Sequence, residues 1–375
     1  MKKVRVIQLI HGFPTGGAES LVKQYCLLFN KDKIELLVVA LHNYHSIFDQ
    51  ELLERGIRVM YIDDIIDKRF SVFPAVFQKV MHRVYRKSLV KRMIRDFSPN
   101  VIHYHLMLSD YIKYANPHTG IKIYLTIHSD PQKLWGKKKN AKKDRRAIEW
   151  LIKNKTFRFI ALHEVMRKEI NEMFGVRDAI VIKNGIITER FTTTMSKTNQ
   201  KKELEIPESS TVIGHIGSFV KVKNHRFLVE VFDNYLKINN DAILVLIGTG
   251  KLKKSIEKLV KKNKIEDHVY FLGVRSDIPE LLHIMDALIF PSLYEGLPLT
   301  LIEAQMAKVP CLVSDRVTKD VKISNLLYFE SLNHSADDWA KMLNQIIRNT
   351  PKPVVNSKDW DLKNIVSELE QLYIS

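Results

Sequence analysis

Short apolar runs alternate with segments of helical spacing along most of the chain. Short apolar runs between turn signals are typical of buried strands, and apolar residues that recur every three to four positions are typical of helices. The alternation predicts a doubly wound α/β fold built on parallel sheets. In the first half the predicted strands cover residues 4–10, 34–41, 56–62, 101–105, 121–128, 157–162 and 179–183, and a predicted helix covers residues 17–30.

The second half restarts this alternation after a polar stretch at 192–210, which we interpret as a linker. We therefore expect two Rossmann-like domains, residues 1–190 and 191–357, that face each other across a cleft. A C-terminal helical segment, 358–375, is expected to cross back to the first domain. The predicted strands of the second domain cover residues 212–216, 243–247, 269–272, 287–290 and 311–313.

Length and composition fit this organisation. A chain of 375 residues suits two domains, and 45% hydrophobic with 27% charged residues is typical of a soluble globular protein. The cysteines, Cys26 and Cys311, are few and far apart, which favours a reducing compartment without disulfides or a zinc site. Arg5 and Gln8 interrupt the first apolar run, which indicates a strand rather than a signal peptide. No apolar run approaches the roughly 18 residues of a membrane span, so we expect a cytoplasmic protein.

The positive charge lies almost entirely in the first half. The whole chain carries +17; residues 1–190 hold 35 basic against 19 acidic residues (+16), and residues 191–375 hold 24 against 23 (+1). Two basic segments stand out, residues 79–97 and residues 137–146. In the first, Val80, Val84, Met93, Ile94 and Phe97 recur near helical spacing. The asymmetry suggests an anionic partner, either a membrane surface or a nucleic acid, although each segment could also be the solvated face of an ordinary helix.

Two carboxylates, Glu295 and Glu303, follow the predicted strand at 287–290. Pro298 fits the first turn of a helix, where its missing N–H is not needed, and Gly296 permits close approach of the backbone to a ligand. The free N–H groups and the positive end of a helix dipole favour a phosphate there. Acidic residues at helix starts are also common caps, so this run by itself leaves both readings open.

Taken in order, the motifs of the chain resemble those of the retaining glycosyltransferases of GT-B architecture, family 4 (group 1). Within that family the chain most resembles enzymes of capsular and exopolysaccharide synthesis. The ordered combination is what makes the resemblance specific, since a lone Gly-Gly or Gly-x-Gly is a weak signal. The motifs that carry it lie at residues 12–19, 183–186, 213–219, 223–225, 247–250, 271–273 and 295–303.

The resemblance implies a nucleotide-sugar donor, most simply UDP-linked, held by the second domain. Glu303 would accept hydrogen bonds from the ribose hydroxyls, and Glu295 would hold hydroxyls of the transferred sugar. Lys223 would offset the diphosphate charge, although taken alone it reads as a surface lysine. The remaining residues implied to contact the donor are Gly16, Gly17, Gly217, Gly248, Val274, Gly296, Leu297, Leu299 and Thr300.

The chain departs from the family pattern at one position. The family usually has an arginine directly after the glycine at 217, and here Ser218 occupies that place. The expected cationic pair is therefore incomplete, and Lys221 is the candidate substitute.

Histidines cluster at the ends of predicted strands in the first domain. By the resemblance, His128 contacts the donor sugar near the reaction centre, although it could equally be a satisfied structural histidine. His103 and His105 alternate on one strand and should share a face, and His163 follows another strand and could reach the cleft. We expect no metal at these histidines because no carboxylate spacing supports one.

The run Asp359-Trp360-Asp361 superficially matches an acid-x-acid metal site. We interpret one of its acids as the cap of the last helix, because no strand precedes the run and no other acids cluster near it.

The implied reaction is metal-independent transfer of a sugar, with retention at the anomeric carbon, to a lipid-linked or growing glycan at the inner face of the membrane. No cofactor is expected, because the nucleotide sugar is a substrate. Three alternatives stay open: a sugar-nucleotide epimerase of the same fold, a non-catalytic nucleotide-sugar sensor, and a nucleic-acid-binding protein. An epimerase would need acids placed for elimination in the first domain, and the sequence shows none there. The sequence also lacks the basic, aromatic-rich motifs of common RNA-binding modules, so we expect no nucleic acid.

Overall fold

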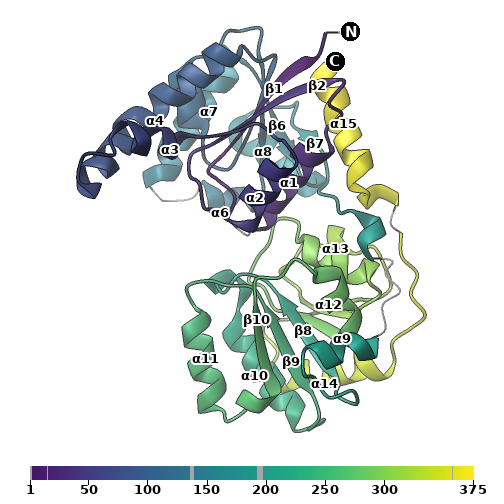
Figure 1. Ribbon diagram of the computed structural model, residues 1–375. Coiled ribbons are helices and arrows are strands. Elements are labelled where there is room, and N and C mark those ends of the chain that lie inside the picture. Colours follow the sequence, from purple (N-terminus) through teal and green to yellow (C-terminus); the bar gives the residue numbers. More distant parts are fainter. Residues whose placement is uncertain (1, 15, 136–138, 192–196, 357) are drawn as a thin grey trace. The chain divides into compact units, whose positions relative to one another are not determined.

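The computed structural model describes residues 2–14, 16–135, 139–191, 197–356 and 358–375. The chain divides into two compact units (Figure 1). The first unit holds Met1–Asn184 and Lys363–Ser375, and the second holds Gly185–Leu362. The first unit thus ends after Asn184 rather than after residue 190, and part of the predicted linker, residues 192–196, lies outside the described residues.

The first unit is built on a parallel seven-stranded sheet of order β3-β2-β1-β4-β5-β6-β7. The chain starts at the centre with β1, runs outward to β3, and then returns to the other side of β1 at β4. The crevice beyond β1 and β4 is therefore the topological switch point, where ligands of such sheets bind. The strands are β1 (Val4–Ile10), β2 (Ile34–Ala40), β3 (Val59–Tyr61), β4 (Val101–His105), β5 (Lys122–Thr126), β6 (Thr156–Ala161) and β7 (Ile180–Val181).

Helices cover this sheet, and the last helix of the chain belongs to them. Glu370 on that helix accepts a hydrogen bond from the Asn30 backbone N–H at 2.5 Å, which fixes the C-terminal segment to the first unit. The helices are α1 (Gly17–Leu28), α2 (Ile47–Glu54), α3 (Ile62–Arg69), α4 (Ala75–Phe97), α5 (Ser109–Ala115), α6 (Pro131–Leu134), α7 (Lys139–Asn154), α8 (Glu164–Phe174) and α15 (Leu362–Ile374).

The basic segment with helical spacing at residues 79–97 lies in helix α4. Only its C-terminal half presents apolar residues to the core, namely Val90, Ile94 and Phe97. Val80 and Val84 are 51% and 59% exposed, so their side chains do not join the core. That half extends away from the sheet beside α3 (Figure 1), so it has no sheet surface to cover.

The second unit repeats the same strand order around a six-stranded parallel sheet, β10-β9-β8-β11-β12-β13. Its switch point lies between β8 and β11. The sequence did not predict the edge strand β13. The strands are β8 (Val212–Ile216), β9 (Ile243–Ile247), β10 (Val269–Gly273), β11 (Ala287–Phe290), β12 (Cys311–Ser314) and β13 (Leu327–Glu330).

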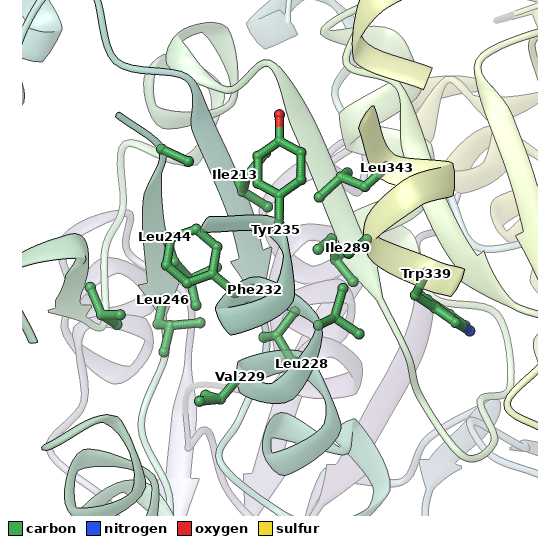
Figure 2. Packing of buried hydrophobic residues seen from close by; sticks show 14 of the residues in the cluster. Ile213, Leu228, Val229, Phe232, Tyr235, Leu244, Leu246, Ile289, Trp339 and Leu343 are labelled. Atoms are coloured by element: carbon green, nitrogen blue, oxygen red, sulfur yellow. The ribbon is translucent and has the colours of Figure 1, made fainter. Parts of the chain in front are cut away.

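The core of the second unit lies where α10 and α14 pack on one face of this sheet. Figure 2 shows Leu228 and Phe232 of α10 directed toward the strand residues Leu244 and Ile289, with Trp339 of α14 close by. The buried residues of α10 recur every three to four positions, so they lie on one face of the helix. The helices are α9 (Lys197–Glu203), α10 (His225–Leu236), α11 (Lys253–Lys262), α12 (Ile278–Ile284), α13 (Leu299–Met306) and α14 (Ala336–Arg348).

Both units therefore confirm the predicted Rossmann-like α/β fold with parallel sheets. Cys26 and Cys311 are buried free thiols.

Candidate active site

Two loops meet at the carboxyl ends of β8 and β11, the neighbouring central strands of the second unit. The loop after β8 holds Lys223, and the loop after β11 holds Glu295 and Gly296. A backbone hydrogen bond of 2.8 Å from Leu293 N–H to Val222 C=O joins the loops. The switch point thus collects residues that are far apart in the sequence.

Lys223 and Glu295 form an ion pair across these loops. The Lys223 Nζ lies 2.7 Å from the Glu295 Oε1, and each side chain is only 16% exposed. The same Nζ stands 4.6 Å from the centre of the Phe290 ring, a cation–π contact. The cation and the acid that were expected to hold different parts of a ligand are therefore bonded to each other. An incoming phosphate would share Lys223 with Glu295 or take it over.

Helix α13 begins directly after Pro298, as the proline predicted. Gly296 and Leu297 lead into it, and Leu299 and Thr300 form its first turn. The N–H groups of a first helical turn have no partner within the helix, so this end can receive an anion.

Glu303 lies one turn inside α13. Burial raises the pKa of its carboxyl to about 7, and the nearby positive charge of Arg190 acts in the opposite direction. The side chain is half-buried rather than enclosed, so it remains available to a ligand. At neutral pH this group is close to the midpoint of its titration.

A buried glutamine fixes the far end of α13. Gln305 is fully buried and donates from its Nε2 to the carbonyl oxygens of Leu301 and Val321, both at 2.8 Å. Its Oε1 accepts from the backbone N–H groups of Ile323 and Ser324 at 3.1 Å. A single side chain thus ties α13 to the segment that follows β12, and so positions the anion-receiving end of the helix.

The glycines after β9 permit close packing of two loops. Gly248 and Gly250 have φ of +136° and +154°. A Cβ at Gly248 would lie 2.3 Å from the Gly217 carbonyl oxygen, and one at Gly250 would lie 2.7 Å from the Phe219 carbonyl oxygen. The loop after β9 therefore supports the backbone of the loop that carries Lys223, a structural role besides the nucleotide contact implied by the resemblance.

Other predicted residues of the second unit lie around the same sheet edge. Gly217 stands beside Lys223: a Cβ there would approach the lysine Cε to 3.2 Å. Val274, directly after β10, is 43% exposed and accessible. Ser218 is half-buried and Lys221 is exposed, so Lys221 differs from the half-buried Lys223 in its surroundings.

In the first unit the predicted glycines stand at the carboxyl end of β1. Gly16 precedes α1 and Gly17 is its first residue. A Cβ on Gly17 would meet no atom within 4 Å, which leaves open space at this position. A Cβ on Gly16 would meet only the flexible Glu19 carboxylate.

The predicted histidine pair is present and extends to a third ring. The His103 and His105 rings lie on one face of β4, 4.3 Å apart between centroids. His105 Nδ1 is 3.0 Å from Nε2 of His128, which follows β5. Burial, with the neighbouring His128, lowers the pKa of His103 to about 3, and burial lowers the pKa of His128 to about 4, so both are neutral at pH 7.

His163, by contrast, serves as a helix cap. Its Nδ1 accepts a hydrogen bond from the Met166 backbone N–H at 3.2 Å, at the start of α8. The sequence offered it as a ligand-facing group because it follows a strand, but a residue in that position also precedes a helix.

Some of the surrounding network was missed from the sequence. Gln8, in the middle of β1, and Tyr373, on α15, are buried and bonded to each other at 3.0 Å. A polar residue inside an apolar strand was the available signal for Gln8. No sequence signal pointed to Tyr373, because it occupies an ordinary apolar position of its helix.

Two kinds of feature are absent from residues 2–14, 16–135, 139–191, 197–356 and 358–375. That part of the chain holds no cluster of three or more His, Cys, Asp or Glu side chains placed to bind a metal ion. None of its helices combines the length and hydropathy needed to cross a bilayer. Asp361, one of the two candidate caps of the last helix, accepts a hydrogen bond from Thr188 at 3.2 Å.

Comparison with known proteins assigns this arrangement to a family. Residues 196–358 match the family described as glycosyl transferases group 1, and residues 15–190 match glycosyltransferase family 4. The chain belongs to this glycosyltransferase family. The predicted resemblance to the family 4 (group 1) glycosyltransferases is therefore confirmed, and the protein is a glycosyltransferase of the polysaccharide-biosynthesis type.

Three relatives illustrate the similarity in sequence. The putative glycosyltransferase EpsF of Bacillus subtilis (strain 168) is 27% identical over 90% of this chain and 86% of its own length. The Escherichia coli UDP-Gal:alpha-D-GlcNAc-diphosphoundecaprenol alpha-1,3-galactosyltransferase is 26% identical over 84% of each chain. The capsular polysaccharide biosynthesis glycosyltransferase CapH of Staphylococcus aureus is 23% identical over 99% of each.

Two solved structures illustrate the similarity in fold. Anabaena Alr3699/HepE, in complex with UDP and glucose, superposes with a TM-score of 0.72 at 16% identity over 97% of this chain and 95% of its own. WaaG, a glycosyltransferase involved in lipopolysaccharide biosynthesis, superposes with a TM-score of 0.69 at 13% identity over 98% and 95%. The GT-B fold expected from the sequence is thereby confirmed.

Proposed function

We propose that this glycosyltransferase moves a hexose from a UDP-linked donor, with retention at the anomeric carbon, to a lipid-linked or growing polysaccharide acceptor in capsule or exopolysaccharide synthesis. The observation that carries the proposal is the Lys223–Glu295 pair beside the first turn of α13. A cation, a carboxylate and free helix amides at one sheet edge match the diphosphate and the hydroxyls of a nucleotide sugar. The named donor of the Escherichia coli relative and the UDP in the Anabaena structure support the choice of UDP.

In this proposal the diphosphate binds Lys223 and the amides from Gly296 to Thr300. Glu295, released from Lys223, accepts hydrogen bonds from the hydroxyls of the sugar. Glu303 accepts hydrogen bonds from the ribose, one turn further along the helix. Gly217, beside Lys223, keeps the donor contact that the resemblance implies, and so do Gly16 and Gly17, of which Gly17 has open space at its Cβ position.

The transfer step needs no side-chain nucleophile. The acceptor hydroxyl oxygen forms its bond to the anomeric carbon on the face from which the diphosphate oxygen departs. The hydroxyl proton passes to an oxygen of the leaving diphosphate, so atoms and charge balance without a metal ion. Lys223 and the helix amides stabilise the negative charge that develops on the diphosphate. The role proposed for His128 is contact with the sugar, as the resemblance implies.

A panel of nucleotide sugars tests the donor. A ligand that binds the folded state raises the melting temperature by mass action, so UDP-sugars should stabilise the protein more than other nucleotide sugars do. Transfer is then measured as UDP release that depends on added acceptor. Glu295→Gln should abolish transfer, whereas Glu230→Gln, which breaks the exposed Arg226–Glu230 pair of α10, should not. Stabilisation without any transfer by the wild type would favour a non-catalytic nucleotide-sugar sensor, the alternative that Ser218 suggests.

The acceptor side of the proposal includes an anionic membrane surface. The turn after α3 and the first half of α4 carry apolar side chains that face solvent: Val72 is 87% exposed, Val76 is 77% exposed, and Val80 and Val84 exceed half. Phe73 and Phe77 stack on each other beside them, with centroids 4.6 Å apart. Apolar side chains with interleaved cations suit the boundary between headgroups and acyl chains.

Fewer cations are available there than the sequence suggested. Arg86 is bonded to Asp63, and Lys87 and Lys143 are both bonded to Asp110. Lys137 and Lys138 of the second basic segment lie outside the described residues. In the proposed membrane contact, the exposed apolar side chains of Val72, Val76, Val80 and Val84 therefore contribute more than the number of basic residues suggests.

Vesicle co-sedimentation tests this contact. The wild type should bind anionic vesicles at low salt and ignore neutral ones. Val76→Asp should remove most of the binding, whereas Val165→Asp on α8, another helical valine that is 57% exposed, should leave it intact. Equal binding by both variants would contradict the placement of the contact at α4.

A further inference from the structure

A chain of buried hydrogen bonds runs through the interior of the first unit. It starts at Thr126, whose Oγ1 lies 2.7 Å from His103 Nε2. His103 Nδ1 lies 2.6 Å from the hydroxyl of Tyr373 on α15. That hydroxyl accepts a hydrogen bond from Gln8 Nε2 at 3.0 Å. All four residues are buried, so water cannot replace these contacts.

The chain continues from Gln8 to the edge of the sheet. Gln8 Oε1 lies 2.8 Å from His105 Nε2, and His105 Nδ1 lies 3.0 Å from His128 Nε2. The remaining ring nitrogen, His128 Nδ1, is inaccessible to solvent and has no hydrogen-bond partner in the part of the chain that the structure describes. We call the six residues, Thr126, His103, Tyr373, Gln8, His105 and His128, the relay.

The orientation of the Gln8 amide fixes which group donates and which accepts in each hydrogen bond of the relay. Its Oε1 can only accept, so His105 must carry its proton on Nε2. The other nitrogen of His105 is then an acceptor, and His128 must donate to it from Nε2. This leaves a lone pair on His128 Nδ1.

Donors and acceptors can also be assigned at the other end of the relay, and the assignment is consistent with the first. The Tyr373 hydroxyl has one hydrogen, and it already accepts from Gln8. It therefore donates to His103 Nδ1, and His103 donates from Nε2 to Thr126. Burial raises the pKa of Tyr373 well above its usual range, so the hydroxyl keeps its proton.

The rings of the relay are neutral, which is the condition for a defined tautomer. The pKa values of His103 and His128 are lowered to about 3 and about 4, chiefly by burial. Burial, with the other two histidines, also holds the pKa of His105 well below its usual range.

We propose that the relay holds His128 as the Nε2–H tautomer, so that Nδ1 is a hydrogen-bond acceptor. Gln8, His105 and Tyr373 are then positioning residues for His128. This inference rests on the proposed function, in which His128 contacts the donor sugar. Nδ1 is closed to solvent in this structure, so a ligand reaches it only when the His128 side chain or its loop turns. An acceptor nitrogen then binds a hydroxyl of the sugar and disfavours a phosphate oxygen, which is itself an acceptor. A bound hydroxyl would also relieve the cost of an unpaired buried nitrogen, about 1–3 kcal/mol.

The tautomers can be read directly in the ligand-free protein. In long-range ¹H–¹⁵N spectra of protein labelled at histidine, a neutral ring shows which nitrogen is protonated. Signals of His128 are assigned by their loss in His128→Gln. We expect His103, His105 and His128 all to carry the proton on Nε2. A His128 with its proton on Nδ1, or an even mixture of both tautomers, would overturn the proposal.

Two tyrosines of the same region provide a matched pair of variants. Tyr373→Phe removes the hydroxyl that orients Gln8. Tyr124→Phe removes a neighbouring buried hydroxyl that donates to the Leu372 carbonyl of α15 at 3.3 Å but stands outside the relay. We expect Tyr373→Phe to give His128 mixed tautomers and to lower kcat/KM roughly two- to tenfold, the range for one hydrogen bond. Tyr124→Phe should change neither. Equal effects of the two variants on the His128 signals would refute the positioning role.

The wild-type spectrum decides the direction of the relay even if Tyr373→Phe folds poorly. It also separates this inference from the proposed function, because the tautomers are measured without substrate. Failure of the proposed function would appear instead as absence of UDP-dependent transfer by the wild type.

Discussion

Replacing Glu303 by glutamine changes how the stability of the protein depends on pH. The pKa of Glu303 is raised from an ordinary 4.5 to about 7 because the carboxyl is partly buried. The folded state therefore binds a proton more tightly than the unfolded state does. The stabilising effect of the bound proton is complete below about pH 4.5 and is lost as pH rises to about 7. Glutamine does not titrate, so the variant lacks this loss.

The magnitude follows from the two pKa values. Their difference is about 2.5, and each pKa unit corresponds to about 1.36 kcal/mol, which gives an upper limit of about 3 kcal/mol. Glu303 is half-buried, and contact with solvent weakens the effect, so we expect about 1–2 kcal/mol. The free energy of unfolding of Glu303→Gln should therefore rise by this amount relative to the wild type between pH 5 and pH 8.

Thermal unfolding of both proteins at pH 5, 6, 7 and 8 measures this difference, and the comparison cancels every titration that the two share. The same carboxyl gives a second measurement if it binds ribose hydroxyls as proposed. The affinity for UDP should then rise more between pH 6 and pH 8 in the wild type than in the variant, where only the titration of the UDP phosphate remains. Parallel stability curves for the two proteins across this range would refute the reasoning about burial.

Three further changes test the arrangement around α13 and the loop after β8. Lys223→Met should weaken UDP binding about 10- to 100-fold in calorimetric titrations, because charge-assisted hydrogen bonds contribute about 1.5–3 kcal/mol; unchanged affinity would remove Lys223 from the site. Gly250→Ala should lower the melting temperature, with a loss of about 2 kcal/mol or more, because its Cβ would collide with the Phe219 backbone, whereas Gly17→Ala should not. Gln305→Leu should cost about 2–5 kcal/mol in urea unfolding, since it leaves several buried backbone groups unpaired; a loss below 1 kcal/mol would show that α13 does not depend on it.

The strands were predictable where they lie inside a sheet and nearly all of their residues are buried. The predicted ranges 212–216, 243–247 and 287–290 coincide with β8, β9 and β11, which lie inside the second sheet. The missed strand β13 is at the edge of that sheet, and most of its residues are only half-buried. An edge strand has one neighbour and a weaker apolar pattern, so its sequence resembles that of a loop.

The candidate site was predictable one residue at a time but not as a set of contacts. Glu295 and Glu303 were placed correctly before and inside a helix, because proline and glycine mark the start of helices locally. The bond between Lys223 and Glu295 joins residues 72 positions apart, and the bond between Gln8 and Tyr373 joins residues 365 positions apart. Such contacts depend on strand order, which local periodicity does not encode.

The first unit can be completed only late in protein synthesis, because it includes the C-terminal helix. Domains generally fold as they emerge from the ribosome, the N-terminal one first. Here the first sheet emerges early, but the helix that bonds to Asn30 and Gln8 is translated only after the whole second unit. The second unit, Gly185–Leu362, is continuous and can fold in between. A chain that stops before residue 363 would thus hold a complete second unit and a first sheet whose buried polar groups still lack their partners.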